Sequence, residues 1–355
     1  MIPTSSSLPF GAVDAARRQL AAWLDLCGLR PHETPSSSRS CGPLVTLKTY
    51  PAADPRGPVL LIVPAPIKRA YICDLLPAVS AVRRCLEGGF RVYLIQWEPP
   101  GAKAQASGLA YYADHAILDC LNAIEAATGQ RRVVLVGHSL GGTLAAIFAA
   151  LHPDRVRGLV LVEAPLSFGA GVSAFDPVVR ASAPASGTDS IGNVPGSLID
   201  VLAMTASPTT FIWARHLDFL LSWFDPQALH VHLLVERWAL DEMALTRRLF
   251  VETLDWLYRE DRFMQQKLVV AGRLARPQSI DAPIASVTAP ASRVVLPAAI
   301  LPFHEAVAST DTEVFWYGGD HGVALQHVGP LVGRQAHRQL WPRIIRWLTE
   351  HTAGH

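Results

Sequence analysis

Apolar runs and segments with helical spacing alternate along the first half of the chain. The runs at 58–64, 90–97 and 133–136 have the length and the β-branched and leucine content that are typical of strands buried on both faces. Between them, 77–87 and 112–127 carry apolar residues at the spacing of a helix face. This alternation predicts an α/β fold with a doubly wound, mostly parallel sheet, whose ligand site lies at the carboxyl ends of the strands. The same reasoning predicts further strands at 44–50, 157–163, 284–288 and 312–317, and helices at 12–26 and 334–350.

The regular alternation stops after Pro165. Residues 169–197 are rich in Gly, Ala, Ser and Pro, whereas 198–264 predict helices dense in aromatic residues. We interpret this part of the chain as a helical cap inserted into the core, and such a cap can close over a site and exclude water. The alternative is a plain helical extension that packs its aromatic side chains inward. The predicted organisation is an N-terminal helix and linker (1–45, with the Pro/Ser-rich linker at 31–40), a core (46–168 and 266–355) and the cap (169–265).

A Gly-x-Ser-x-Gly pentapeptide, Gly137 to Gly141, connects the strand at 133–136 to an apolar helical run at 143–150. A strand, a tight turn and a helix are the context in which this pentapeptide forms a nucleophile elbow, with the serine oxygen exposed above the sheet. Gly137 and Gly141 lack a Cβ, so the strand and the helix can approach closely there. A chance match in a loop would not account for the flanking elements, so we expect Ser139 to be a nucleophile.

Two backbone amides are candidates for stabilising an oxyanion beside this serine. The amide of Leu140 follows the nucleophile and faces the space in which the oxyanion would form. The second donor is expected in the loop after the strand at 58–64, where the prolines carry no N–H group. Ala65 and Ile67 are the donors available in that loop, and we favour Ile67.

A serine needs a base to take its proton, and in a fold with such an elbow the base is a histidine on a loop after the last strand. His321, in the glycine-rich turn at 318–322, follows the strand at 312–317, so we expect it to be the base. The other late histidines fit less well: His327 lies in a looser loop, His337 in a predicted helix, and His351 and His355 in the tail.

The third member of such a site is a carboxylate that accepts the other ring N–H of the histidine. It normally follows the strand that precedes the histidine-bearing one, and here that segment, 284–295, has no Asp or Glu. One alternative is Glu163, at the carboxyl end of the strand that follows the elbow helix, although a solvated glutamate at a strand end is the competing interpretation. Asp281 and Asp311 are placed less well, Asp320 is too close to His321 in sequence to support it, and a site without an acid is the remaining alternative.

Composition argues against several other classes of protein. The 31 basic and 30 acidic residues give a net charge of +1, with no basic stripe for nucleic acid. The five cysteines are an odd number without a Cys-x-x-Cys motif, which is typical of reduced thiols in an intracellular protein. We see no secretory signal and no apolar run long enough to span a membrane, so we expect a cytoplasmic protein. The high apolar content leaves room for contact with a lipid-like surface.

Several segments resemble the polyhydroxyalkanoate synthases. The segment VPAPIKRAYICDL at 63–75 is similar to their "VPP-INK-YILDL" segment, and 90–100 is similar to their "VFVISWRNP" strand. The elbow resembles their lipase-like box, and 318–322 matches their "GGHIG" histidine loop with one residue shifted. The similarity extends, weakly in the cap, over about 45–348, and the chain length is close to that of the short, two-subunit members.

This resemblance implies an α/β-hydrolase fold with a cap, covalent acyl transfer from 3-hydroxyacyl-CoA onto a growing polyester, and association with polymer granules. Two positions differ from the family pattern. Polymerising members have a cysteine where this chain has Ser139, and their catalytic aspartate, in an Asp-x-(Ile/Val)-Val-Pro pattern, corresponds to Ser292. A thiolate suits thioester exchange, whereas a serine acyl-enzyme is typical of esterases and thioesterases.

These observations favour a serine acyl-enzyme hydrolase or acyltransferase that acts through Ser139 and His321, with Glu163 as the candidate acid. We expect no cofactor or metal, and a substrate that is an acyl thioester, carried by CoA or a carrier protein, or a hydroxyacyl ester. The alternatives are a polyhydroxyalkanoate synthase that polymerises 3-hydroxyacyl-CoA, and a catalytically degenerate granule-associated or regulatory subunit. The partners to expect are the acyl substrate, a second copy or a second synthase-type subunit, and a lipid or polyester surface, with no nucleic acid.

Overall fold

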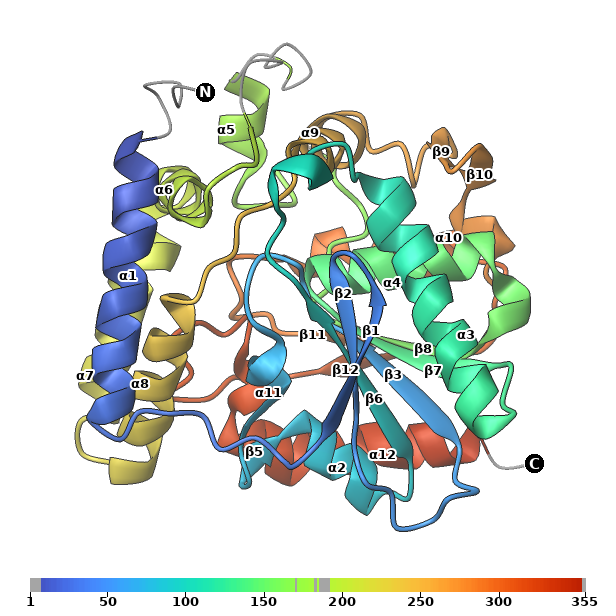
Figure 1. The fold of residues 1–355 in the computed structure, drawn as a ribbon, viewed down its shortest axis with the longest axis horizontal. Coiled ribbons are helices and arrows are strands. Elements are labelled where there is room, and N and C mark those ends of the chain that lie inside the picture. The colour runs from blue at the N-terminus through green and yellow to red at the C-terminus, as the bar shows by residue number, and fades with distance from the viewer. Residues whose placement is uncertain (1–7, 170, 182–183, 185–191, 353–355) are drawn as a thin grey trace.

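An eight-stranded, mostly parallel sheet forms the centre of the molecule (Figure 1). The computed structural model describes residues 8–169, 171–181, 184 and 192–352. In spatial order the strands are β1 (Ser37–Gly42), β2 (Val45–Thr49), β6 (Arg91–Trp97), β3 (Val59–Val63), β7 (Val133–His138), β8 (Val156–Val162), β11 (Ile284–Thr288) and β12 (Thr312–Trp316). The pairs β1–β2 and β2–β6 are antiparallel, and the other neighbouring strands of the sheet are parallel. The predicted α/β fold with a doubly wound sheet is confirmed.

Helices cover both faces of this sheet (Figure 1). The helices of the core are α2 (Ala81–Glu87), α3 (Ala116–Thr128), α4 (Leu140–Leu151), α10 (Leu301–Ala306), α11 (Gly329–Val332) and α12 (Trp341–Glu350). In β3, Val59, Leu61 and Val63 pack with side chains of α3 and α4, whereas Leu60 and Ile62 pack with those of α2 and α12. The continuous apolar run that predicted this strand therefore reflects burial on both of its faces.

Several helix boundaries differ from the prediction. The helix predicted at 77–87 begins only at Ala81, because Ser80 caps it by accepting a hydrogen bond from the Arg83 amide at 2.9 Å. The residues before it form two short paired strands, β4 (Asp74–Leu76) and β5 (Val79–Ser80). The helices predicted at 112–127 and 334–350 each open with a π-helical turn, η3 (Tyr111–His115) and η10 (Ala336–Leu340) respectively.

The linker predicted at 31–40 is wrong in its second half, because β1 begins at Ser37 and pairs with β2 along the edge of the sheet. Its first four side chains are exposed, so no apolar pattern marks the strand in the sequence. A second hairpin, β9 (Leu268–Val270) with β10 (Arg273–Ala275), was not predicted, because each of its strands has only three residues.

The segment predicted as a cap is helical, and the N-terminal helix lies beside it (Figure 1). Its helices are α5 (Asp176–Ala181), α6 (Gly196–Ala206), α7 (Ala214–Ser222), α8 (Pro226–Ala239) and α9 (Arg247–Glu252), with π-helical η6 (Thr209–Trp213) and η7 (Thr253–Arg259). From α1 (Leu8–Leu26), Arg17 forms an ion pair of 2.6 Å with Asp200 of α6, and Asp25 accepts two hydrogen bonds of 2.8 Å from Arg237 of α8. The N-terminal helix is therefore attached to the cap as well as to the chain that follows it.

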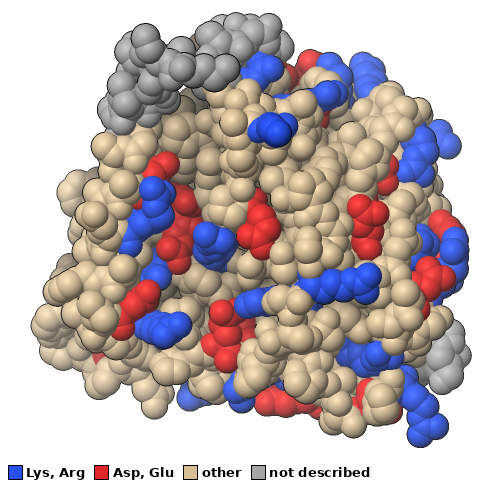
Figure 2. All heavy atoms as spheres, viewed as in Figure 1, with Lys and Arg blue, Asp and Glu red and all other residues tan. Residues whose placement is uncertain are grey.

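Charges of both signs are mixed over the face of the molecule seen in Figure 2, without a large patch of either sign. No helix in the described ranges has the length and apolar character that crossing a membrane requires.

Candidate active site

The Gly-x-Ser-x-Gly pentapeptide has the strand–turn–helix geometry that the sequence predicted. Ser139 stands between the end of β7 and the start of α4 with a φ of 55° and a ψ of −134°, a strained conformation for a residue with a side chain. A Cβ on Gly137 would lie 2.4 Å from the Gly142 Cα, and one on Gly141 would lie 2.2 Å from the Val63 oxygen. Only glycine fits at these two positions, so the sharp turn at the serine depends on them.

Ser139 lines a cavity of about 250 Å³ between the core and the cap. The wall is largely apolar, and the cap supplies Phe211, Trp238, Phe250 and Tyr258 to it. Other cap aromatics point outward, and the Phe224 side chain is 92% exposed. This helical segment therefore places part of its aromatic side chains in the wall of the cavity and part of them on the surface.

A histidine and a carboxylate are hydrogen-bonded beside this cavity. His327 lies in the wall of the same cavity as Ser139, and its Nδ1 is 3.3 Å from Oε2 of Glu163. Glu163, which follows β8, is fully buried, and its Oε1 accepts a hydrogen bond of 2.6 Å from the Ala289 amide. A serine, an imidazole and a carboxylate that accepts from the far side of the imidazole are the three groups of a serine hydrolase triad.

The expectation that His321 faces the serine is wrong. His321 is exposed and is not part of the wall of the cavity that contains Ser139. The chain enters the wall of that cavity at Ala324, three residues after His321, and His327 is the histidine that it brings there. The triplet His327-Val328-Gly329 keeps the His-apolar-Gly order of the "GGHIG" segment, and this signal could have indicated from the sequence that His327 is a candidate.

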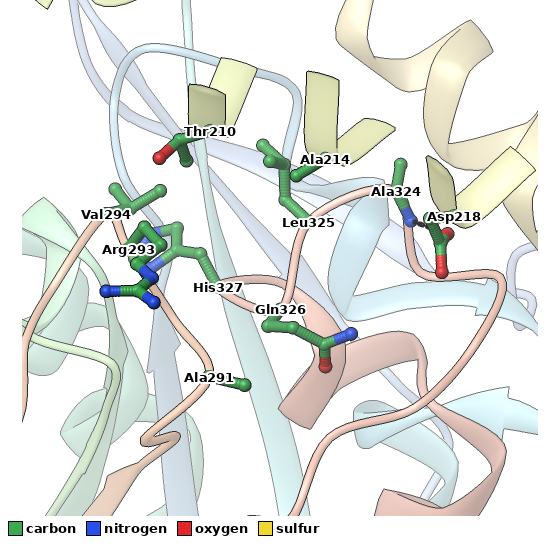
Figure 3. A pocket seen from close by; sticks show the side chains of 10 residues that line it. All are labelled: Thr210, Ala214, Asp218, Ala291, Arg293, Val294, Ala324, Leu325, Gln326 and His327. Atoms are coloured by element: carbon green, nitrogen blue, oxygen red, sulfur yellow. Dashed lines mark hydrogen bonds between the residues drawn. The ribbon is translucent and has the colours of Figure 1, made fainter. Parts of the chain in front are cut away.

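The loop that carries His327 is held from two sides. In the cap, the carboxylate of Asp218 accepts hydrogen bonds from the amides of Gly322 at 3.0 Å and Ala324 at 2.9 Å. In the core, the ring of His138 donates through Nε2 to the backbone oxygen of His327 at 3.1 Å. Figure 3 shows Asp218, Ala324 and His327 around a second, smaller cavity of about 70 Å³ next to the first. The backbone on both sides of His327 is thus fixed by groups outside its own loop.

The other candidate acids lie elsewhere. Asp281 and Asp311 precede β11 and β12, at the amino ends of the strands and away from the serine, and Asp311 instead contacts His351 at 2.8 Å. Asp320 accepts a hydrogen bond of 3.0 Å from the Tyr317 hydroxyl and another from the Gln335 amide. Both roles are structural, which leaves Glu163 as the carboxylate that reaches a histidine of the cavity wall.

Ser292, at the position of the family's aspartate, lies against Glu163. Its side chain is buried, and its hydroxyl favours the ionised form of the Glu163 carboxylate and so lowers its pKa. In this chain the carboxylate of Glu163 therefore approaches the site from the end of β8, whereas the aspartate of the family would approach it from the loop after β11. Because adjacent parallel strands end side by side, a carboxylate on either strand can approach the same imidazole.

Burial sets the protonation of these groups. It raises the pKa of Glu163 to about 8, against the opposing effect of the hydrogen bonds from Ser292 and Ala289. Burial also lowers the pKa of His327 to about 4, and that of His138 to about 3 with a contribution from the neighbouring His327. His327 is therefore neutral near pH 7, and one nitrogen of its ring can accept a proton.

The two expected oxyanion donors, Leu140 and Ile67, both contribute to the cavity wall. Leu140 is the first residue of α4, where backbone N–H groups have no partner within the helix. The loop of Ile67 is tied to the cap, since the Met243 amide donates to the Ile67 oxygen at 2.8 Å and Lys68 pairs with Glu242 at 2.6 Å. Ala65, the other donor considered from the sequence, lines the cavity as well.

The fold and this pocket define an α/β-hydrolase, and the sequence matches the alpha/beta hydrolase fold family over residues 70–185. More particularly, the chain is polyhydroxyalkanoate synthase-like. It is 30% identical over 295 residues to the poly(3-hydroxyalkanoate) polymerase subunit PhaC of Haloferax mediterranei, a match that covers 82% of this chain and 59% of that protein. It is 27% identical over 292 residues to the subunit of the same name from Allochromatium vinosum, covering 82% of this chain and 80% of that one. The chain thus spans about three fifths of the length of the first relative.

Solved structures agree on the fold. The 2-hydroxy-6-oxo-6-phenylhexa-2,4-dienoate hydrolase of Rhodococcus sp. strain RHA1 superposes with a TM-score of 0.55 at 14% identity, covering 91% of this chain and 99% of that one. The monoacylglycerol lipase of Paleococcus ferrophilus superposes with a TM-score of 0.51 at 15% identity, covering 83% and 96%. At these identities the likeness concerns the fold alone.

Proposed function

We propose that this chain is a serine acyl-enzyme hydrolase or acyltransferase with Ser139, His327 and Glu163 as its triad. The observation that carries the proposal is the pairing of His327 with Glu163 in the wall of the cavity that also contains Ser139. Compared with the residues that the sequence suggests, the proposed triad differs at one position, with His327 in place of His321.

In the proposed reaction the Ser139 hydroxyl attacks the carbonyl carbon of an acyl ester or thioester, and His327 takes the hydroxyl proton. Glu163 accepts the Nδ1–H of His327, which fixes the tautomer and stabilises the imidazolium that forms. The amides of Leu140 and Ile67 stabilise the oxyanion. His327 then returns the proton to the departing thiol or alcohol, and water or an alcohol releases the acyl group from the serine.

The cavity supports an apolar acyl chain as the group that is transferred. Its wall is mainly aliphatic and aromatic, although charged residues such as Lys68, Arg215 and Glu242 also line it. Burying such a chain contributes roughly 0.8 kcal/mol per methylene, which favours acyl groups of several carbons over acetate. The similarity to proteins named as poly(3-hydroxyalkanoate) polymerase subunits supports hydroxyacyl thioesters as the first substrates to test.

Polyester synthesis is the second candidate function, and the sequence similarity is the observation that favours it. Polymerisation needs the same elbow and the same base, with a hydroxyacyl group as the acceptor in place of water. The two candidates differ in product. Incubation with a 3-hydroxyacyl-CoA gives free acid if the chain is a hydrolase and chain growth if it is a synthase.

Intact-protein mass spectrometry after brief exposure to a panel of acyl-CoAs tests the proposal. A mass increase equal to one acyl group, absent in Ser139→Ala, is the expected result. Labelling by a fluorophosphonate probe gives an independent readout, and it should be lost in Ser139→Ala and in His327→Ala. An unlabelled wild-type protein, at a probe concentration that labels ordinary serine hydrolases, would overturn the proposal and favour a catalytically degenerate subunit.

A further inference from the structure

The smaller cavity, of about 70 Å³, shares a wall with the cavity that contains Ser139. Three parts of the chain surround it (Figure 3): the loop after β11 with Ala291, the cap with Ala214, and the histidine loop with Gln326. Four residues belong to the walls of both cavities: Val294, Ala324, Leu325 and His327. A single layer of side chains therefore separates the two spaces, and the imidazole of His327 is part of that layer.

The smaller cavity extends from the protein surface to this imidazole. Ala291 and Arg293 in its wall are exposed, and so is Ala214 at the start of α7. His327 and Asp218, which also belong to its wall, are buried. Solvent can thus approach the histidine from this side without passing through the larger cavity.

Polar side chains give the smaller cavity its character. Thr210, Asp218 and Gln326 all contribute to its wall. The amide of Gln326 is held in place, since its Oε1 accepts from the backbone N–H of Asp320 at 3.0 Å and its Nε2 donates to the Asp320 oxygen at 2.6 Å. A water molecule in a cavity needs room for its own volume and about two to four polar partners. The smaller cavity meets both conditions, whereas the mainly aliphatic and aromatic wall of the larger one suits an acyl chain.

The position of His327 between the two cavities suits a base that serves both. Its Nδ1 faces Oε2 of Glu163 at 3.3 Å, so Nε2 is the ring nitrogen that accepts a proton. An acyl chain on Ser139 fills the larger cavity, and the group that releases it then needs another way to the base. A hydroxyl in the smaller cavity has this access while the acyl chain stays in place.

We propose that the smaller cavity is the acceptor site, which holds the water molecule or short-chain alcohol that releases the acyl group. This inference rests on the proposed acyl-enzyme. His327 takes the proton of the acceptor hydroxyl through Nε2, and the acceptor oxygen forms a bond to the acyl carbonyl carbon. The bond between that carbon and Oγ of Ser139 then breaks, and His327 returns the proton to Oγ. Water gives the free acid, and an alcohol gives its ester.

Filling the smaller cavity tests the inference. Ala214→Leu fills it from the cap, and Ala291→Leu fills it from the loop after β11. Both alanines are exposed and neither lines the larger cavity, so both variants should fold, which thermal unfolding checks. Each variant should still acylate Ser139 with p-nitrophenyl butyrate, but it should release the acyl group at least about 10-fold more slowly, because the acceptor is displaced from the base.

Rapid quench with intact-protein mass spectrometry follows the release step directly, in water and with added alcohols. In wild type, methanol and ethanol should speed up the loss of the acyl group and give the corresponding esters, whereas 1-hexanol is too long for the site and should not. Both filled variants should lose the response to methanol. Ala203→Leu is the matched control, since Ala203 lines only the larger of the two cavities, and it should slow acylation by longer acyl esters while the response to methanol remains.

Folded Ala214→Leu and Ala291→Leu variants that release the acyl group at the wild-type rate would overturn the inference. A wild-type protein for which 1-hexanol is as good an acceptor as methanol would do the same, and so would variants with slower acylation but unchanged release. Each of these results leaves the acyl-enzyme itself intact. A wild-type protein that forms no acyl-enzyme at Ser139 would instead overturn the proposed function, and the inference with it.

Discussion

Moving the carboxylate from position 163 to position 292 should restore the activity that Glu163→Gln removes. Glu163 accepts from Nδ1 of His327 at 3.3 Å, and the Ser292 hydroxyl lowers the pKa of its carboxyl against the effect of burial. An aspartate at 292 would bring a carboxylate to the edge of the same small space. In Glu163→Gln the amide oxygen can still accept from Ala289, so the backbone support of the site is retained.

The size of the effect follows from the role of the acid. Loss of the carboxylate leaves the imidazole without its orienting acceptor, which costs about 10⁴-fold in kcat in a triad, or roughly 5 kcal/mol. Neither Glu163 nor Ser292 lines the cavity, so KM should change little. The double variant Glu163→Gln/Ser292→Asp should recover at least about 10-fold of the lost kcat, since a hydrogen-bonded carboxylate again faces the imidazole.

Ser292→Asp alone should behave differently from the double variant. It places two carboxylates in one buried site, where a second negative charge raises the pKa of Glu163 further above its value of about 8. The increase of kcat with pH should therefore shift to a higher pH than in wild type. The double variant would then compensate the defects of each single change.

The assay is the steady-state hydrolysis of a p-nitrophenyl acyl ester, with the rate of fluorophosphonate labelling as a measure of the nucleophile alone. Thermal unfolding of each variant controls for folding. A double variant that unfolds like wild type but is no more active than Glu163→Gln would refute the idea that the two positions serve one acid site. An unchanged rate in Glu163→Gln would remove Glu163 from the mechanism altogether.

Further predictions concern the base, the acid and the loop between them. His327→Ala should abolish fluorophosphonate labelling, whereas His321→Ala, its matched control on the same loop, should label at the wild-type rate; the reverse result would restore His321 as the base. Because the pKa of Glu163 is raised to about 8, kcat should increase with pH through that value as the carboxylate ionises, and Glu163→Gln should lack this increase in a pH profile. Between pH 4.5, the ordinary pKa of a glutamate, and about pH 8, the folded protein holds a proton on Glu163 that the unfolded chain has lost. The contribution of Glu163 to the free energy of unfolding is therefore greatest below this pH range and falls as pH rises through it. Glu163→Gln should therefore gain in Tm relative to wild type from pH 5 to pH 8, and an equal Tm difference at both pH values would contradict the raised pKa. Asp218→Ala leaves the buried amides of Gly322 and Ala324 without an acceptor, which costs about 1–3 kcal/mol each before relaxation. The variant should therefore have both a lower Tm and a lower kcat than wild type. A lower Tm with an unchanged kcat would show that this loop does not position His327.

The elements predicted best from the sequence are those whose pattern reflects burial. The core strands read as apolar runs because helices cover both faces of the sheet, as Leu60 and Leu61 illustrate by packing on opposite sides. The edge strand β1 was missed for the opposite reason, since its first side chains are exposed and only its backbone is paired. Main-chain pairing without side-chain burial leaves no periodic pattern in a sequence.

The serine turn was accessible to prediction because its requirements are local. A strand, two glycines and a helix fix Ser139 within a few residues of sequence, and backbone strain at φ 55° is part of that motif. The choice between His321 and His327 depends on how the loop at 317–328 folds over the sheet, and Asp218, more than a hundred residues earlier, holds that loop. Local patterns do not record such a distant contact.

The acid lies between these two cases. Glu163 could be named because the carboxyl ends of parallel strands lie at one edge of the sheet, and the structure places β8 and β11 side by side there. The histidine that contacts Glu163 could not be named from the sequence, because its identity depends on how the loop before α11 folds. The sequence therefore defined the edge of the sheet at which the chemistry should occur more firmly than it defined the residues that face each other there.

The contact of Asp218 with the histidine loop links substrate entry to the state of the imidazole. Helix α7 belongs to the cap, and if it lifts away from the core, its carboxylate leaves the amides of Gly322 and Ala324. The base would then lose its support at the moment when solvent gains access to the serine. The open protein would admit a ligand but would be a poor catalyst. Closure of the cap on a bound acyl chain would restore the contacts of Asp218 and the reactive arrangement, so hydrolysis is limited while the site is open to solvent.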